Sequence, residues 1–146
     1  MLIESLFAFL SADQGMQVYL GLPTSRTDST TGIFPTQAID QPSMPYLVIS
    51  QVAGSPLQES MQGTGCLTSE RWRFSCNGTT YRSAKKFGKY VRSLMLGLNG
   101  NQTVGSSFIQ GVWHKLEADE SEALGKGTMF STHHDFQISY QDFDTN

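Results

Sequence analysis

The sequence predicts one α+β domain, in which a mostly antiparallel or mixed sheet of about four strands carries an N-terminal helix and a central amphipathic helix. Apolar residues follow helical spacing in two segments and strand spacing in four others. The 146 residues suit one domain with a single core, spanning 1–146. A content of 38% hydrophobic and 16% charged residues is typical of a β-containing, loop-rich chain.

The first element is expected to be a helix, because Leu2, Leu6, Leu10 and the apolar residues beside them recur at helical intervals. Gly15 is predicted to end it, and residues 16–20 then form a short strand or a further helical turn. The apolar run is far shorter than the roughly 20 residues that cross a bilayer, so we predict no membrane partner. No basic residues precede it as in a signal peptide, which favours synthesis in the cytosol.

Flexible loops are predicted near residues 21–32, 54–66 and 117–128. The first belongs to a stretch that contains four of the five prolines, residues 21–45. Within it, residues 32–35 are expected to form a short edge strand, because proline cannot donate a hydrogen bond to a neighbouring strand.

Two strands are predicted before the central helix. Residues 46–52 are apolar on both alternating sets and follow Pro45, as expected of a strand that is covered on both faces. Residues 70–76 alternate, and this pattern predicts one core face and one wet face. The core set is Trp72, Phe74 and Cys76, and the wet set is Arg71, Arg73 and Ser75.

A two-faced helix is expected to begin after Asn77-Gly78, with Thr79 or Thr80 as its cap, and to be ended by Gly97 and Gly100. Gly88 beside its apolar stripe predicts a close approach to the sheet. Leu96 is expected to point into the opposite face, where an apolar residue that contacts a partner would lie. That face holds five of the ten Lys and Arg residues in a chain of net charge −3: Arg82, Lys85, Lys86, Lys89 and Arg92.

Two further strands are expected over residues 108–116 and 129–141. The second alternates, with His134 and Phe136 on one face and His133 and Asp135 on the other. Four acids follow the first of these strands: Glu117, Asp119, Glu120 and Glu122. Because they repel one another, this segment is predicted to be a solvated loop or to face a cation.

No catalytic motif is present in the sequence, which lacks Gly-x-Ser-x-Gly and a Gly-Lys-Ser/Thr phosphate loop. Gly63-Thr64-Gly65 precedes a strand, so a hairpin or hinge turn is favoured over a phosphate cradle. Residues of metal-ligand type occur, namely His114, His133, His134 and Asp135, but strand neighbours point to opposite faces. Cys66 and Cys76 match no ligand spacing and are predicted to be free thiols. We therefore expect no enzyme, no metal and no cofactor.

The basic helix face has three interpretations. It is a solvated face that keeps the protein soluble, a surface that neutralises nucleic-acid phosphates, or a contact between subunits. The net negative charge and the scarcity of aromatic residues among the cations argue against nucleic acid. A cationic surface and an acidic one on the same chain suit head-to-tail association around a closed ring.

The order of the elements carries a resemblance to a known family. The matching features are the short N-terminal helix, Ile33-Phe34-Pro35, the strand from Met44 to Ile49, Gly63-Thr64-Gly65, the helix entry at Thr80-Tyr81 with Ala84 and Leu94, and a closing strand from Phe136 to Tyr140. In this order they resemble phage tail-completion proteins, the group that includes the tail terminator and tail-to-head joining proteins of long, flexible-tailed phages. A long Ser/Thr-rich insertion at 24–31 and the positive Arg71 and Arg73 depart from the pattern.

This resemblance implies a structural virion protein of the tail–neck region, assembled in the host cytoplasm. Such a protein caps the tail tube as a homohexameric ring, stops polymerisation and provides the docking surface for the head connector or neck protein, while DNA passes through without sequence recognition. The expected interface comprises the five cations, Leu96, the four acids and Gly63, Thr64 and Gly65. The alternatives are another neck or head-completion adaptor, or a small nucleic-acid-binding module that uses the basic helix face.

Overall fold

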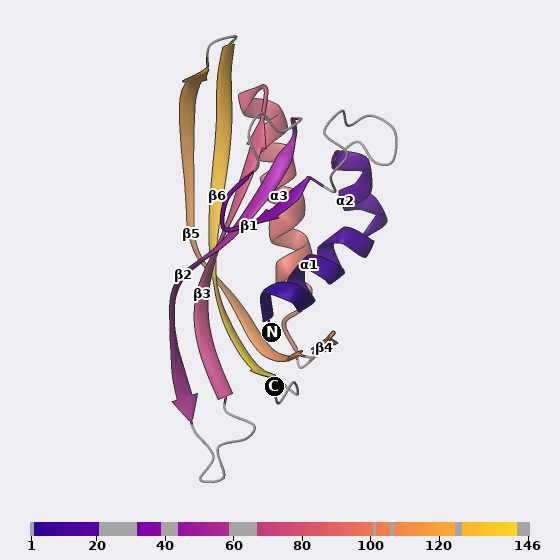
Figure 1. Cartoon of the computed structure of the whole chain (residues 1–146), viewed down its shortest axis with the longest axis vertical. Helices are drawn as coiled ribbons and strands as arrows, with labels where there is room; N and C mark the ends of the chain where they lie inside the picture. The colour runs from indigo at the N-terminus through magenta and orange to yellow at the C-terminus, as the bar shows by residue number, and fades with distance from the viewer. Residues whose placement is uncertain are drawn as a thin grey trace.

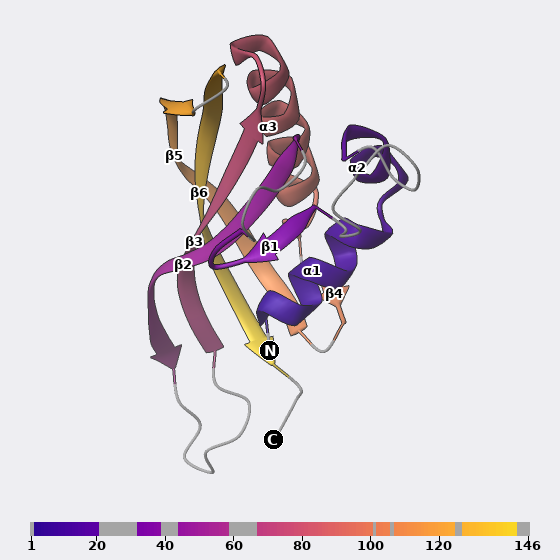
Figure 2. The ribbon, with the colours of Figure 1, turned by 45° about the horizontal axis from the view of Figure 1, so that its top comes forward.

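The computed structural model describes residues 2–20, 32–38, 44–58, 67–100, 102–105, 107–124 and 127–142. It contains one curled sheet with helices on one side (Figures 1 and 2). The strands are β1 (Ile33–Pro35), β2 (Tyr46–Gln58), β3 (Leu67–Gly78), β4 (Gln102–Val104), β5 (Ser107–Leu124) and β6 (Gly127–Asp142). The helices are α1 (Leu2–Ala12), α2 (Gln14–Tyr19) and α3 (Tyr81–Leu96).

The sheet has the order β1-β2-β3-β6-β5-β4. Strand β1 is parallel to β2, and the other neighbours are antiparallel. The predicted α+β class with about four strands is therefore wrong, because the described sheet has six strands and dominates the molecule. Two strands are three-residue edges, of which β1 was expected and β4, a polar segment, gave no strand pattern.

Two predicted loops are in part strands. Strand β2 continues to Gln58, and β5 continues through residues 117–124, which pair with β6. The acids of β5 tolerate an extended conformation because alternation sends neighbouring side chains to opposite faces of the sheet. The predicted loops at 21–31 and 59–66, with Gly63, Thr64, Gly65 and Cys66, lie outside the described residues.

One face of the sheet forms the core together with the helices. The predicted alternation of β3 and β6 is confirmed, since Phe74 and Phe136 are fully buried with their rings 5.4 Å apart, edge to face. Helix α3 covers these strands with Phe87, Val91 and Met95. Helix α1 adds one apolar stripe to the same core, Leu2, Leu6 and Leu10.

Local sequence sets the positions of the helices. The Thr80 hydroxyl caps α3 by accepting from the backbone N–H of Ser83, whose own hydroxyl accepts from Thr80 N–H. The helical alternative for residues 16–20 is the observed one, because Asp13 caps α2 through Met16 N–H. Gly15 was predicted to end the first helix but lies inside α2. At this position the Tyr90 hydroxyl leaves no space for a Cβ.

The predicted close approach at Gly88 is confirmed. A Cβ built there would lie 2.8 Å from Nε2 of His134 and 3.1 Å from Cγ2 of Thr132. The glycine therefore lets the helix axis sit directly on β6.

Candidate interaction surfaces

The acidic run of β5 is divided between the two faces of the sheet. Asp119 lies opposite Thr132 of β6 on the helix side. Glu120 lies on the other side, where its Oε2 is 2.9 Å from Nε2 of His133. The acids therefore do not form the single acidic surface that was expected, because they are divided between the two faces of the sheet. Of the two alternatives for this segment, a solvated loop or acids that face a cation, the second holds on the helix side.

Lys85 of α3 is that cation. Its Nζ lies 3.1 Å from Oε1 of Glu117 and 2.9 Å from Oδ1 of Asp119, and 5.8 Å from the centre of the Tyr81 ring. Hydrogen bonds to the lysine lower the pKa of both carboxyls, while the hydrogen bond to Asp119 raises the lysine pKa. Part of the basic helix face and part of the acidic run are thus paired within one chain.

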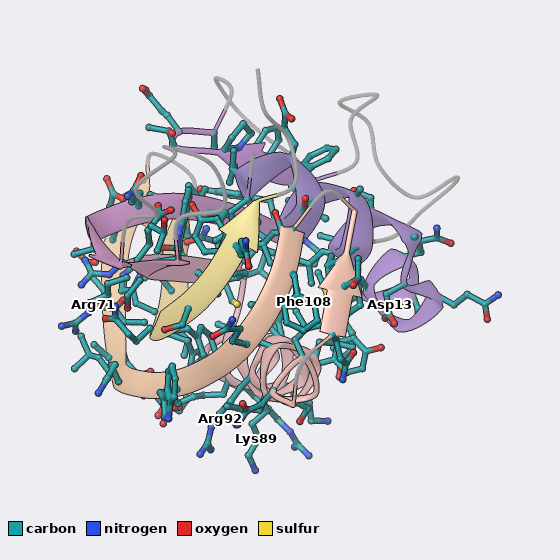
Figure 3. All side chains as sticks on the ribbon, turned by 90° about the horizontal axis from the view of Figure 1, so that it is seen from below. Asp13, Arg71, Lys89, Arg92 and Phe108 are labelled. Carbon is teal, nitrogen blue, oxygen red and sulfur yellow. The ribbon has the colours of Figure 1, made fainter. Side chains whose placement is uncertain are left out.

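Four cations of α3 remain exposed: Arg82, Lys86, Lys89 and Arg92. No carboxylate in the described part of the chain forms an ion pair with any of them. Lys89 and Arg92 extend away from the body of the protein (Figure 3). Leu96 is half-buried against the core, which reduces the apolar area that it offers to a partner. We call the four cations the α3 cationic stripe.

The sheet face away from the helices holds a buried charge cluster. Asp135 of β6 has no exposed side-chain surface, and Arg73 donates to Oδ1 at 2.8 Å and to Oδ2 at 3.1 Å. Arg71 donates to Oδ2 at 3.1 Å through Nε. Burial raises the pKa of Asp135, but the two guanidinium groups outweigh it and hold that pKa below its usual range. The positive face predicted for β3 is therefore partly neutralised by a carboxylate that sequence reasoning counted only as a possible metal ligand.

Apolar side chains are exposed on the same face. Trp113 of β5, opposite Gln137, is 50% exposed, and its ring packs over Gly111. Leu116 of the same strand is also exposed. Exposed aromatic and aliphatic groups beside arginines are typical of protein-contact surfaces.

At each of its two edges the described sheet has a long strand that is only partly covered by a short outer strand. Strand β1 pairs with β2 over Leu47–Ile49, and β4 pairs with β5 over Ser107–Ile109. Within the described residues, β2 beyond Ile49 and β5 beyond Ile109 have no second strand neighbour. Such edges present unpaired backbone N–H and C=O groups to another chain.

The histidines fall on both faces, as their adjacency predicted. His133 lies on the face of Ser75, whereas His134 is buried under α3 with its Nδ1 2.9 Å from Nε2 of His114. Burial lowers the pKa of His134 to about 4. Among the described residues no three metal-type ligands gather into one group. Cys76 is a free, buried thiol.

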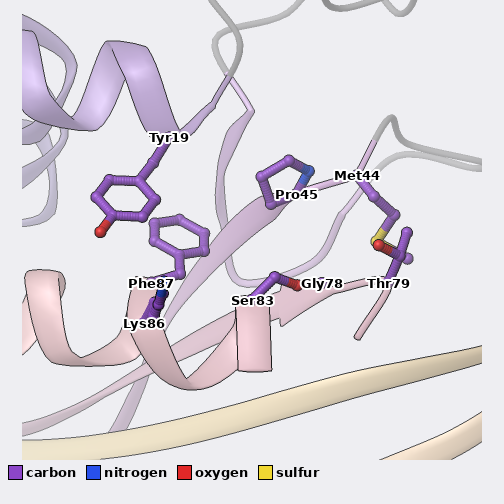
Figure 4. Close-up of a pocket in the computed structure, with 8 residues that line it drawn as sticks. All are labelled: Tyr19, Met44, Pro45, Gly78, Thr79, Ser83, Lys86 and Phe87. Atoms are coloured by element: carbon purple, nitrogen blue, oxygen red, sulfur yellow. The ribbon is translucent and has the colours of Figure 1, made fainter. Parts of the chain in front are cut away.

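A pocket of about 240 Å³ opens beside the N-terminal end of α3 (Figure 4). Its apolar wall contains Met44 and Pro45 together with the rings of Tyr19 and Phe87, which stack 5.8 Å apart. Its polar rim consists of Gly78, Thr79, Ser83 and Lys86. Sequence patterns gave no signal for it, because its walls come from α2, α3 and the segment before β2.

Comparison with known proteins identifies the fold. No protein-family model matches the chain, and no curated protein matches it by sequence. A solved structure, the virion of a native gene transfer agent particle, contains a chain that is similar with a TM-score of 0.62 and 14% identity. The match covers 93% of this chain and 91% of that chain, so the two share a fold over nearly their whole lengths. No helix in the described ranges is both long and apolar enough to cross a membrane.

Proposed function

We propose that this protein is a structural component of a phage-like virion, where it caps the end of the tail tube as a ring, stops tube growth and provides the docking surface for the head connector. The observation that carries the proposal is the fold shared, over more than nine-tenths of each chain, with a chain of the gene transfer agent virion. The order of sequence elements that resembles tail-completion proteins agrees with it.

The sheet edges favour a ring over a two-fold dimer. Pairing β5 with another β5 would bring together strands that each carry Glu117, Asp119, Glu120 and Glu122, and like charges across a strand pair are destabilising. Strand β2 has no charged residue, so β5 of one copy pairs more favourably with β2 of the next. Such a contact between unlike edges is heterologous, and it closes into a ring when the rotation between neighbours permits.

The α3 cationic stripe is the surface offered to a neighbouring subunit or to another virion protein. Because Lys85 is neutralised within the chain, Arg82, Lys86, Lys89 and Arg92 account for the available positive charge on the helix. Four exposed cations favour a partner with an acidic patch, and rim charges of this kind set association rate and partner choice. Gly63, Thr64 and Gly65, which lie outside the described residues, supply a further contact with a subunit or partner.

Mass measurement in solution tests this function. The protein is examined alone and with purified tail tube protein, by native mass spectrometry and electron microscopy of the tube ends. A cap of six copies would have a mass of about 97 kDa, six times the 16.1 kDa of one chain. We expect capped tubes that no longer elongate. Tubes that elongate equally with and without the protein, and never carry it at an end, would contradict the proposal.

A further inference from the structure

We infer that the pocket beside α3 binds residues 142–144 of a neighbouring copy of this chain, with Phe143 inserted in the pocket and Asp142 and Asp144 held by Arg82, Lys86 and Lys89 of α3. This inference rests on the self-association proposed above. It commits the pocket to one occupant, a segment that immediately follows β6 in the sequence.

The pocket has the size and lining that an aromatic ring requires. Its volume of about 240 Å³ exceeds the roughly 150 Å³ of an apolar cavity that accommodates benzene. The stacked rings of Tyr19 and Phe87 form one wall, and Pro45 and Met44 lie across from them (Figure 4). A phenylalanine ring entering here would meet aromatic and aliphatic carbon on its faces.

The charges at the rim match the occupant. Lys86 lines the pocket, and Arg82 and Lys89 lie four residues before and three residues after it, so the three share one side of α3. Phe143 is flanked on both sides by aspartates, in the sequence Asp142-Phe143-Asp144. An anchor ring between two carboxylates therefore faces an apolar pocket bordered by cations.

The occupant must come from another copy. The pocket residue Gly78 pairs with Phe130 near the start of β6, whereas Asp142 ends that strand. Twelve residues of strand span about 40 Å. One further residue extends a chain by at most about 3.8 Å, which is far too short for the segment after Asp142 to reach the pocket of its own copy. Figure 1 shows the end of β6 and the start of α3 at opposite ends of the molecule. A contact between opposite ends of two copies is heterologous, because it joins unlike surfaces.

The experiment measures binding of a fluorescent peptide with the sequence of residues 137–146 to the full chain carrying Phe143→Ala, so that the receptor's own segment does not compete. Comparison peptides carry Phe143→Ala, or Asp142→Asn with Asp144→Asn. Receptor variants add Thr79→Trp, which fills the pocket from its exposed rim, or Lys86→Glu. The matched control is Arg92→Glu, an exposed cation of α3 that does not line the pocket. Circular dichroism melts verify that every receptor is folded.

We expect saturable binding that weakens roughly tenfold or more when the peptide loses its phenylalanine ring. Lys86→Glu and Thr79→Trp should each weaken it about fivefold or more, Arg92→Glu less than about twofold, and salt should weaken it because the charges are exposed. Equal binding of all three peptides, equal effects of Lys86→Glu and Arg92→Glu, or no binding at about 1 mM peptide would overturn the inference. If the protein caps tubes but does not bind the peptide, the docking inference fails and the proposed capping function stands. If it binds the peptide but never caps tubes, the capping function fails and the docking inference stands.

Discussion

Replacing Asp135 by Asn should destabilise the protein, because the carboxylate is fully buried and receives hydrogen bonds from Arg71 and Arg73. A hydrogen bond to a charged group contributes about 1.5–3 kcal/mol, and Asp135 accepts three from the two arginines through Nε and Nη atoms. The arginine side chains are more than one-third exposed, so water replaces part of this interaction in the variant. We therefore expect a loss of about 2–4 kcal/mol at pH 7.

The assay is urea denaturation of wild type and Asp135→Asn across pH, with Glu122→Gln, an exposed acid of β5, as the control. The control should remain within about 0.5 kcal/mol of wild type. Since the pKa of Asp135 is lowered in the folded state, its contribution is complete above the unfolded value of about 3.9 and is lost as the pH falls below it. A difference under about 0.5 kcal/mol at pH 7, or one that grows on acidification, would refute the reasoning.

Three further outcomes are expected. Gly88→Ala should lower the free energy of unfolding by about 1–2 kcal/mol despite the better helix propensity of alanine, because the new Cβ meets the buried His134 ring. Urea titration measures this change, and an increase in stability would contradict the close approach. Acidification from pH 6.5 to 4 should destabilise wild type by up to about 3 kcal/mol more than a His134→Phe variant. The reason is that the histidine binds a proton in the unfolded chain, whereas in the folded protein its pKa is about 4 and it stays neutral over most of this range. Parallel stability profiles of the two proteins across pH would refute this role of His134. Lys86→Glu with Lys89→Glu should weaken assembly of the ring or its docking to the neck, while the melting temperature stays within about 2 °C. Unchanged tube caps and normal neck docking in electron micrographs would remove the stripe from the interface.

Periodicity alone predicted much of the sheet and of α3. The alternation of β3 and β6 placed Phe74 and Phe136 in the core because one face is covered by helices and the other is not. The sequence also offered Thr79 or Thr80 as the cap, of which Thr80 is the observed one, and it predicted the close approach at Gly88 from the missing side chain. The three-residue strands β1 and β4 are too short for a periodic signal, and β1 was expected only because Pro35 suits an edge.

The candidate surfaces were harder to predict because they depend on contacts between distant segments. The Asp135 cluster joins β3 to β6 across more than 60 residues of sequence, and the pocket joins α2, α3 and the start of β2. The interaction of Lys85 with Glu117 likewise spans 32 residues. Composition showed that opposite charges were present, but only the strand register decides whether they meet within a chain or between chains.

The pairing of β5 with β6 shifts at two places, and the second shift decides which acids face α3. The pairing shifts between His114 and Leu116, so Lys115 is an extra residue in the strand. His114 faces α3, and strict alternation from it would send Leu116, Ala118 and Glu120 toward the helix. The bulge reverses this order, so Glu117 and Asp119 lie beneath Lys85 and Glu120 lies beside His133 instead. This single inserted residue therefore neutralises Lys85 inside the chain, leaves the rest of the α3 cationic stripe for a partner, and keeps Leu116 exposed on the opposite face.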